Sequence, residues 1–262
     1  MTRNTADSDN DSGSTMSVVD HLEALRWALI RCIGAVVVCA IPCGVYWRRI
    51  FEFAAVRPLR VGGTAAKLIY TAPADAVTLS LKVALTGGLV AASPFIFWEI
   101  WRFVSPGLYK KEKTVILPAA LASTIFFLLG IAFCYRTLPL VLKFLTGFTV
   151  GQIDPYFKVD EYLNFLTKMC VAFGAAFELP VAAFVLSRMG VIDRRFMIRH
   201  ARYAVVAIFI AAAVLTPPDI LSQILLALPL MALYGLGAGV AFLTGKPTAS
   251  PNLSPKLRSP KN

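Results

Sequence analysis

The chain has 262 residues, of which 57% are hydrophobic and 16% charged, and its mean hydropathy is +0.68. Soluble globular proteins are about 45–50% apolar and about 25% charged, so this composition argues against a disordered chain and against a soluble enzyme domain. The net charge of +11 lies in short basic clusters between apolar runs. This pattern favours contact with lipid headgroups over a nucleic-acid groove, which would interleave basic and aromatic residues. The sequence predicts an integral membrane protein.

Residues 1–16 are polar and acidic, and residues 245–262 are rich in Pro, Ser and Lys. We expect both to be disordered, solvated tails, and the first lacks the basic start and apolar core of a signal peptide. Between them, residues 17–244 are predicted to form one all-α transmembrane domain, because a span needs roughly 20 apolar residues. Its six apolar segments are about 27–47, 76–98, 114–135, 163–187, 203–216 and 220–243.

Six spans place both termini on the same side of the membrane. The segments on that side carry about twice as many Lys and Arg residues as the loops on the other side, which predicts cytoplasmic termini. The first outer loop runs against this bias, since it contains five basic residues.

The fifth apolar segment is unusually short. Residues 203–216 span about 21 Å at 1.5 Å per residue, whereas the hydrocarbon core is about 30 Å thick. The segment ends at Thr216-Pro217-Pro218-Asp219, where two prolines cannot continue a helix. A short hairpin must thin the bilayer locally, tilt less or find partners.

Charged residues within the apolar segments are candidates for function, because they are costly in lipid. Lys82 and Lys168 lie near the outer ends of their segments, so we expect them to extend toward the outer headgroups. Glu178 lies mid-way along its segment, and its side chain is too short to do so. It either packs as a protonated acid or faces a polar cavity used in function, and we favour the latter. Pro180 is expected to kink the same helix.

Two further groups of polar residues flank the membrane. On the inner side, the acids that could act are Asp20, Glu23, Glu99 and Glu112; from the residues alone, each is a solvated charge, a helix cap or half of a loop ion pair. On the outer side, Asp219 or Ser222 is predicted to cap the last helix. Capping does not explain Gln223, whose amide either bonds another helix of this chain or a partner helix.

No arrangement of residues indicates catalysis. The two histidines, His21 and His200, lie in separate segments, and the five cysteines form no Cys-x-x-Cys pair. Neither a phosphate-binding glycine loop nor a nucleophile elbow is present. The sequence predicts no enzyme activity, no metal and no cofactor. Cys32, Cys39 and Cys43 share one helical face, which we interpret as small packing residues at a helix contact.

Several fragments, in this order and spacing over roughly residues 16–243, together resemble one family: TatC, the multi-span subunit of the twin-arginine (Sec-independent) protein translocase. The fragments are His21-Leu22-x-x-Leu25-Arg26, Ser93-Pro94 with Trp98-x-x-Trp101-x-Phe103, Ser105-Pro106-Gly107-Leu108-Tyr109-Lys110-Lys111-Glu112, Phe173-Gly174-x-x-Phe177-Glu178-Leu179-Pro180, Arg202-Tyr203 and Thr216-Pro217-Pro218-Asp219-x-x-Ser222-Gln223. Each fragment alone is weak, but the set is specific.

The resemblance implies six transmembrane helices, short fifth and sixth helices, and both termini in the cytoplasm of the bacterial inner membrane. It implies a receptor for twin-arginine signal peptides that works with single-span TatA- and TatB-type subunits, within an oligomeric complex, to export folded proteins with the proton-motive force. Glu112 matches the family's signal-binding glutamate and Phe103 its neighbouring aromatic. Glu178 matches its intramembrane glutamate. Thr216 and Gln223, with Asp219 and Ser222 beside them, match a partner-docking region, and Pro58 resembles a structural proline of the first outer loop.

The sequence departs from the family pattern at Ala24, where a second signal-binding glutamate is usual. Glu23 stands beside it, but a one-residue shift turns a side chain by about 100° around a helix. Asp20 lies on the expected face, and Glu99 stands where the family commonly has glutamine. Our hypothesis is that Glu112 is the primary acid and that Glu23, Asp20 or Glu99 supplies the second carboxylate.

Two alternative functions use fewer of these residues. A proton-coupled small-solute transporter would use Glu178, but it does not need the inner acids and aromatics, and we find no internal repeat of the transporter kind. A scaffold for other membrane subunits would explain the cluster around Gln223 and leave Glu112 and Glu178 without a role.

Overall fold

A computed structural model of the chain describes residues 18–61, 67–104, 116–147, 156–188, 194–215 and 220–244. Over these residues the protein is almost entirely helical, and six of its helices are long and apolar enough to cross a membrane. The predicted all-α, six-span architecture is therefore confirmed. The tails predicted at residues 1–16 and 245–262 lie outside the described residues.

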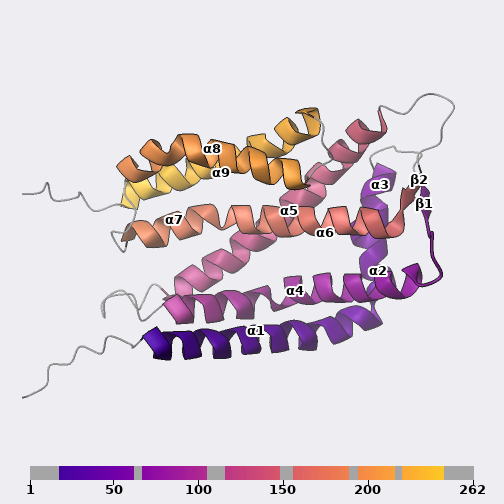
Figure 1. Cartoon of the computed structure of the whole chain (residues 1–262), viewed down its shortest axis with the longest axis horizontal. Helices are drawn as coiled ribbons and strands as arrows, with labels where there is room; N and C mark the ends of the chain where they lie inside the picture. The colour runs from indigo at the N-terminus through magenta and orange to yellow at the C-terminus, as the bar shows by residue number, and fades with distance from the viewer. Residues whose placement is uncertain are drawn as a thin grey trace, which may run out of the picture.

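The spans lie side by side, with α5 crossing the others obliquely, and α1 begins at the same end of the molecule at which α9 ends (Figure 1). We call this the terminal end and the opposite one the far end. α1 packs against α4, α5 against α6, and both α7 and α8 against α9. The helices are α1 (Val18–Val45), α4 (Asp75–Val104), α5 (Ile116–Thr146), α6 (Val159–Phe177), α7 (Leu179–Arg188), α8 (Arg194–Leu215) and α9 (Ile220–Thr244).

The fourth span is broken into two helices, α6 and α7, at Glu178. Pro180 has no backbone N–H, and its ring excludes the carbonyl four residues earlier, so the regular bonding pattern cannot pass through it. The Glu178 amide instead donates to the Ala175 carbonyl at 3.1 Å, which closes a tight turn. The helical bonding pattern is thus interrupted beside Pro180, and Glu178 lies at the interruption.

The last two spans are shorter than the others. The helix α8 has 22 residues and α9 has 25, whereas the first four spans have 28 to 31. The helix α8 is nevertheless longer than the 14-residue apolar segment predicted for it, because it begins at Arg194 and has 22 residues. Its first turns carry the basic residues that precede the apolar segment, which are tolerated at a membrane boundary.

A short helical segment crosses the far end of the bundle (Figure 1). It consists of α2 (Trp47–Phe51), the π-helical turn η1 (Glu52–Val56) and α3 (Arg57–Val61). Beside it, β1 (Lys67–Ile69) pairs in parallel with β2 (Tyr156–Lys158), with Leu68 opposite Phe157. We call α2, η1 and α3 together the crossing segment; neither it nor the strand pair was predicted.

Two tyrosines fix the crossing segment to the bundle. The Tyr162 hydroxyl donates to the Ala55 carbonyl at 2.8 Å, and the Tyr135 hydroxyl donates to the Phe53 carbonyl at 3.2 Å. Both acceptors lie in the π-helical turn, where the backbone bonding pattern changes. Pro58 follows in the first turn of α3, where a proline is tolerated, and its side chain is fully buried. The structural role that the resemblance implies for Pro58 stays a prediction.

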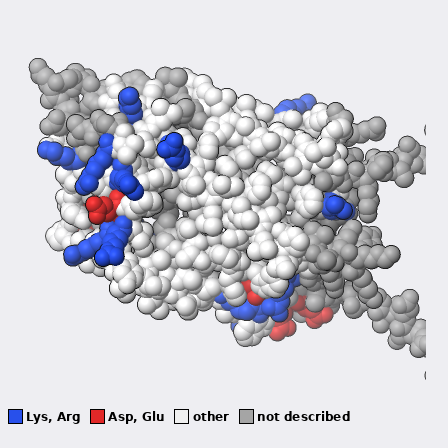
Figure 2. All heavy atoms as spheres, turned by 180° about the vertical axis from the view of Figure 1, so that it is seen from behind, with Lys and Arg blue, Asp and Glu red and all other residues white. Residues whose placement is uncertain are grey.

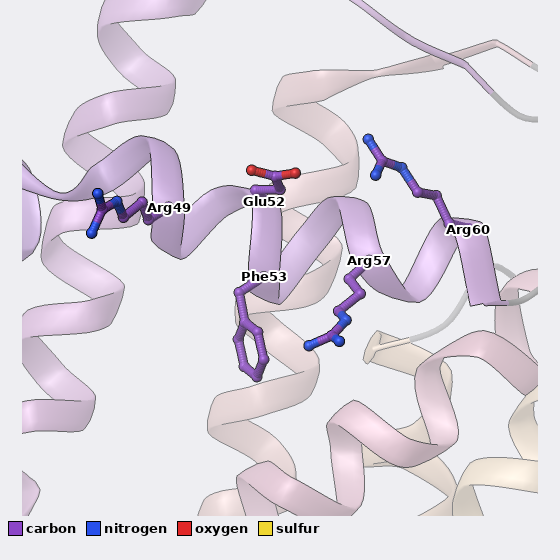
Figure 3. Close-up of a pocket in the computed structure, with 5 residues that line it drawn as sticks. All are labelled: Arg49, Glu52, Phe53, Arg57 and Arg60. Atoms are coloured by element: carbon purple, nitrogen blue, oxygen red, sulfur yellow. The ribbon is translucent and has the colours of Figure 1, made fainter.

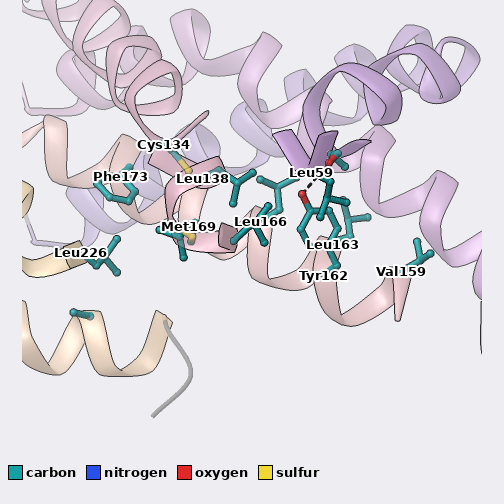
Figure 4. Close-up of a cluster of buried hydrophobic side chains, with 14 of the residues drawn as sticks. Leu59, Cys134, Leu138, Val159, Tyr162, Leu163, Leu166, Met169, Phe173 and Leu226 are labelled. Atoms are coloured by element: carbon teal, nitrogen blue, oxygen red, sulfur yellow. Dashed lines mark hydrogen bonds between the residues drawn. The ribbon is translucent and has the colours of Figure 1, made fainter. Parts of the chain in front are cut away.

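The main hydrophobic core surrounds α6 (Figure 4). Side chains from the crossing segment, α5, α6 and α9 meet there, including Leu59, Leu138, Leu166, Phe173 and Leu226. Large apolar side chains also cover the outside, as expected of a surface in lipid. On the face shown in Figure 2, the Lys, Arg, Asp and Glu side chains that are described gather toward the two ends and leave the middle band without them.

Candidate functional site

The first turns of α1 meet the last turn of α4 at the terminal end. The ring of His21 stacks on that of Phe103, with centroids 4.3 Å apart and planes 24° from parallel. Asp20 and Glu23 flank His21 in the sequence, and both are exposed. The structure therefore places the predicted aromatic residue against the first turns of α1, which also carry two of the predicted acids.

Glu99 lies deeper between the same two helices and is bound within the chain. Its side chain is only 3% exposed. Arg31 donates from Nη2 to Oε2 at 2.8 Å, and Arg102 donates from Nη1 to Oε1 at 3.3 Å. Because each carboxylate oxygen already accepts a charge-assisted hydrogen bond, Glu99 is arranged to hold these two helices rather than to receive a ligand. The sequence analysis did not predict the role of Arg31. An arginine inside an apolar segment needs a partner of opposite charge, so its position was a signal that an acid lies nearby.

The remaining predicted residues of this kind fall where the structure gives no side chain. Glu112, Thr216 and Asp219 lie outside the described residues, and the side chain of Ser222 is likewise undescribed. Glu112 belongs by sequence to the connection between α4 and α5, whose flanking helix ends both lie at the terminal end (Figure 1).

The intramembrane Glu178 is connected to the tryptophan motif of α4 through a serine. Ser123 of α5 is completely buried and accepts a hydrogen bond from Trp101 Nε1 at 3.0 Å. The same serine is a near neighbour of the Glu178 side chain. The Oε1 atom of Glu178 is buried and has no hydrogen-bond partner among the described residues. A buried polar atom in this state is costly, so Glu178 is a candidate for a role beyond packing.

Gln223 forms one of the two kinds of bond that the sequence left open. Its Nε2 atom donates to the Phe209 carbonyl at 2.9 Å, from α9 to α8. The amide therefore holds the short hairpin of α8 and α9 together, as an internal helix contact.

The expectation for Lys82 is wrong. Instead of extending to headgroups, its Nζ atom donates to Asp160 and, at 2.9 Å, to Asn164 Oδ1. These partners lie four residues apart on α6, and one turn further along Thr86 and Thr167 join their hydroxyls at 3.3 Å. A lysine that finds a carboxylate across a helix contact loses less free energy than one held in lipid alone. The polar row joins α4 to α6 near the far end.

Other candidate clusters support packing. Cys43 lies against Gly87, whose missing side chain would come within 3.2 Å of the Cys43 sulfur, so this cysteine does sit at the contact of α1 and α4. Over the ranges that the structure describes, no group of three or more His, Cys, Asp and Glu residues is arranged to hold a metal ion.

The chain was compared with known families, proteins and structures. A family model described as "Sec-independent protein translocase protein (TatC)" matches residues 20–229. The TatC protein of Helicobacter pylori strain J99 is 39% identical over 222 residues, which are 84% of this chain and 87% of the relative. That of Desulforapulum autotrophicum is 38% identical over 228 residues, 87% of this chain and 84% of the relative. The chain belongs to the TatC family.

A solved structure agrees with this assignment. The crystal structure of a twin-arginine translocase receptor, TatC, superposes with a TM-score of 0.78 at 36% identity and covers 86% of this chain and 99% of its own. TatC proteins are components of a protein-transport system and not enzymes, which confirms the predicted absence of catalysis as a class. Family membership also favours protein transport over the alternative of a small-solute transporter.

Proposed function

We propose that this TatC protein is the receptor subunit of a twin-arginine translocase in the bacterial inner membrane, with its terminal end in the cytoplasm. The single observation that carries the proposal is the stacking of Phe103 on His21 in the first turns of α1, which also carry the exposed acids Asp20 and Glu23. The aromatic pair and these acids belong to the terminal end, and the sequence that contains Glu112 joins two helices whose ends lie there. This combination suits a peptide that carries apolar residues behind a pair of arginines.

The chemistry of two adjacent arginines requires carboxylates. A guanidinium group presents a planar fork of donors, which a carboxylate at a partly desolvated surface accepts in two parallel bonds. In the proposed site Glu112 is the primary acid, and Glu23 or Asp20 is the second. Glu99 is a positioning residue, because its oxygens are engaged by Arg31 and Arg102 and it thereby fixes α1 against α4.

We propose that TatA- and TatB-type single-span subunits dock on the hairpin of α8 and α9, near Thr216, Asp219 and Ser222. The outward face of α8 supports this, since Val206, Ile210 and Val214 are large, apolar and exposed along one side of the helix. The bond from Gln223 to Phe209 joins the two helices of this hairpin. A single six-helix bundle is too small to enclose a folded cargo, so the conduit requires several chains, driven by the proton-motive force. Glu178, with its unpartnered oxygen, is the intramembrane group that we assign to the transport step.

The test is peptide binding to the full chain in nanodiscs. A twin-arginine signal peptide is titrated against the wild-type protein and against Glu112→Gln, Glu23→Gln, Asp20→Gln and Glu99→Gln variants, with a twin-lysine peptide in parallel. We expect the twin-lysine peptide and the Glu112→Gln protein each to lose about 1–3 kcal/mol of binding free energy, because lysine keeps the charge but not the fork.

Glu161→Gln is the matched control, because Glu161 is an exposed acid of α6 at the far end. It should leave peptide binding unchanged. Equal binding by the wild type and every variant, and equal binding of both peptides, would show that the peptide senses surface charge only and would contradict the receptor proposal.

A further inference from the structure

The crossing segment carries a groove on its outward side. The groove has a volume of about 270 Å³ and is lined by Arg49, Glu52, Phe53, Arg57 and Arg60. Figure 3 shows Phe53 and Arg57 together on one edge of the segment and Glu52 and Arg60 on the other, with Arg49 one turn away. The five side chains come from one continuous stretch of helix, so the groove does not depend on the packing of distant elements.

The groove is strongly basic. Three arginines face one glutamate in it, and in the part of the chain that the structure describes none of these arginines forms an ion pair with Glu52. The Arg57 guanidinium instead lies over the Phe53 ring, 5.6 Å from its centroid. A guanidinium that lies over an aromatic ring and forms no ion pair keeps N–H donors available to an anion.

Aromatic residues locate the groove at a membrane boundary. Phe53 stacks on Tyr135, with centroids 5.3 Å apart. Tyr135 lies about 28 Å along α5 from Ile116 at 1.5 Å per residue, which is close to the thickness of the hydrocarbon core. Trp47 and the exposed Tyr46 stand at the start of the same segment. Tryptophan and tyrosine gather at the level of the lipid headgroups, so the groove lies at that level.

The other side of the crossing segment is apolar. Ile50, Phe51 and Ala54 line a second cavity, of about 320 Å³, whose other walls come from α1, α4, α5 and α6. The segment therefore turns an apolar side toward the bundle and the membrane interior and a basic side away from them. This is the pattern of a helix that lies in the membrane interface.

We propose that the groove binds the phosphate of an anionic phospholipid headgroup and thereby anchors the far end of the protein to its leaflet. Phosphate oxygens match the arginine fork, and phospholipids supply phosphate at this depth wherever the protein is embedded. Three arginines and one glutamate give the groove a net charge of about +2. This charge favours an anionic headgroup over one whose phosphate is balanced by a positive group of the same lipid. The crossing segment belongs to the first outer loop, whose basic residues are unexpected on the outer side of a membrane. A lipid anchor gives these arginines a role there. The proposal does not depend on the receptor role.

The test is native mass spectrometry of the full chain in detergent, titrated with phosphatidylglycerol, with phosphatidylcholine of the same chain length and with inorganic phosphate. We expect the wild type to bind phosphatidylglycerol more tightly than phosphatidylcholine. An Arg57→Gln/Arg60→Gln protein should bind phosphatidylglycerol about 20- to 30-fold more weakly, since each basic residue near a membrane surface contributes roughly a fivefold factor.

Lys67→Gln/Lys158→Gln is the matched control, because it removes the same charge from exposed strand residues at the same end. It should change the affinity less than twofold. A Glu52→Gln protein should bind phosphatidylglycerol about fivefold more tightly, and a gain of this kind cannot arise from misfolding. Equal affinity for both lipids, equal binding by the wild type and the double arginine variant, or occupation of the site by inorganic phosphate in place of lipid each overturns the proposal.

Discussion

Glu99 shows how a single carboxylate can be buried near a membrane surface at little cost. Removing a charge from water is unfavourable unless every lone pair finds a donor. Here one oxygen accepts from Arg31, 68 residues away in the sequence, and the other from Arg102, one turn along the same helix. Both arginines keep contact with solvent, with side chains 40% and 60% exposed, so only the acid is fully withdrawn. Glu99 thus fixes the surface on which Phe103 and His21 stack.

We predict that Arg31→Gln destabilises the protein more than Arg102→Gln does. The bond from Arg31 is shorter and less exposed, so its loss should lower the free energy of unfolding by about 1–2 kcal/mol, after allowance for solvent screening. The loss of Arg102 should cost about 0.5 kcal/mol. Denaturant unfolding in detergent micelles measures both, with the exposed Arg199→Gln as the control. An equal cost for Arg31 and Arg102 would contradict the assignment of Arg31 as the principal partner.

At the scale of the element, glycines set how closely the helices approach. A Cβ atom at Gly130 of α5 would lie 2.6 Å from the Phe173 carbonyl oxygen and 2.9 Å from the Gly174 Cα atom of α6. Both neighbours are backbone atoms, which cannot move aside. In membranes, helices associate through close backbone packing because lipid offers no hydrophobic driving force. The contact of α5 and α6 therefore depends on these two glycines.

Gly130→Ala is expected to lower the free energy of unfolding by about 1–3 kcal/mol, as overpacking of a tight contact does. Gly235→Ala is the control, because a Cβ atom at Gly235 of α9 would meet nothing within 4 Å. That change should be neutral or slightly stabilising, since alanine favours a helix. The measurement is the free energy of unfolding of both variants under the same conditions. An equal change for Gly130→Ala and Gly235→Ala would show that α5 and α6 can move apart without cost.

At the scale of the whole molecule, the bundle has two hydrophobic thicknesses. The first four spans have 28 to 31 residues, whereas α8 has 22 and α9 has 25, so the two groups differ by about 5–13 Å of helix at 1.5 Å per residue. One flat bilayer cannot match both lengths. The membrane must become thinner beside α8 and α9, or the longer helices must tilt and extend beyond it. For a protein-transport component, a thinner membrane lowers the barrier next to the proposed docking hairpin.

We predict that the far end of α8 becomes covered when the bilayer is thickened. Val214, which is 72% exposed, is replaced by cysteine in a background without the five native cysteines, and labelled with a polarity-sensitive fluorophore. Its emission should shift to shorter wavelength from C14 to C22 lipids. A label at Lys143, in the longer helix α5, should stay in water in both. If Val214 reports the same environment in both bilayers, the two-thickness description is wrong.

Features that depend on local chain chemistry could be predicted from the sequence. Apolar runs of sufficient length determine six spans, and Pro180 determines a break beside Glu178, because both effects act within one or two turns. The start of α8 at Arg194 was missed, since a helix can continue through charged residues once its apolar part is anchored. The crossing segment was missed because its short, mixed stretches carry neither a clear helical period nor the length of a span.

The sequence by itself determined the membrane class, the number of spans, the family and the residue types available at each end. Only the tertiary structure decided which of those residues meet. It paired Glu99 with Arg31, Lys82 with Asp160 and Gln223 with Phe209, and it placed Ser123 between Trp101 and Glu178. The reason is physical: a charge in a helix shows that a partner is needed, but the rotation and depth at which helices pack decide which side chain supplies it.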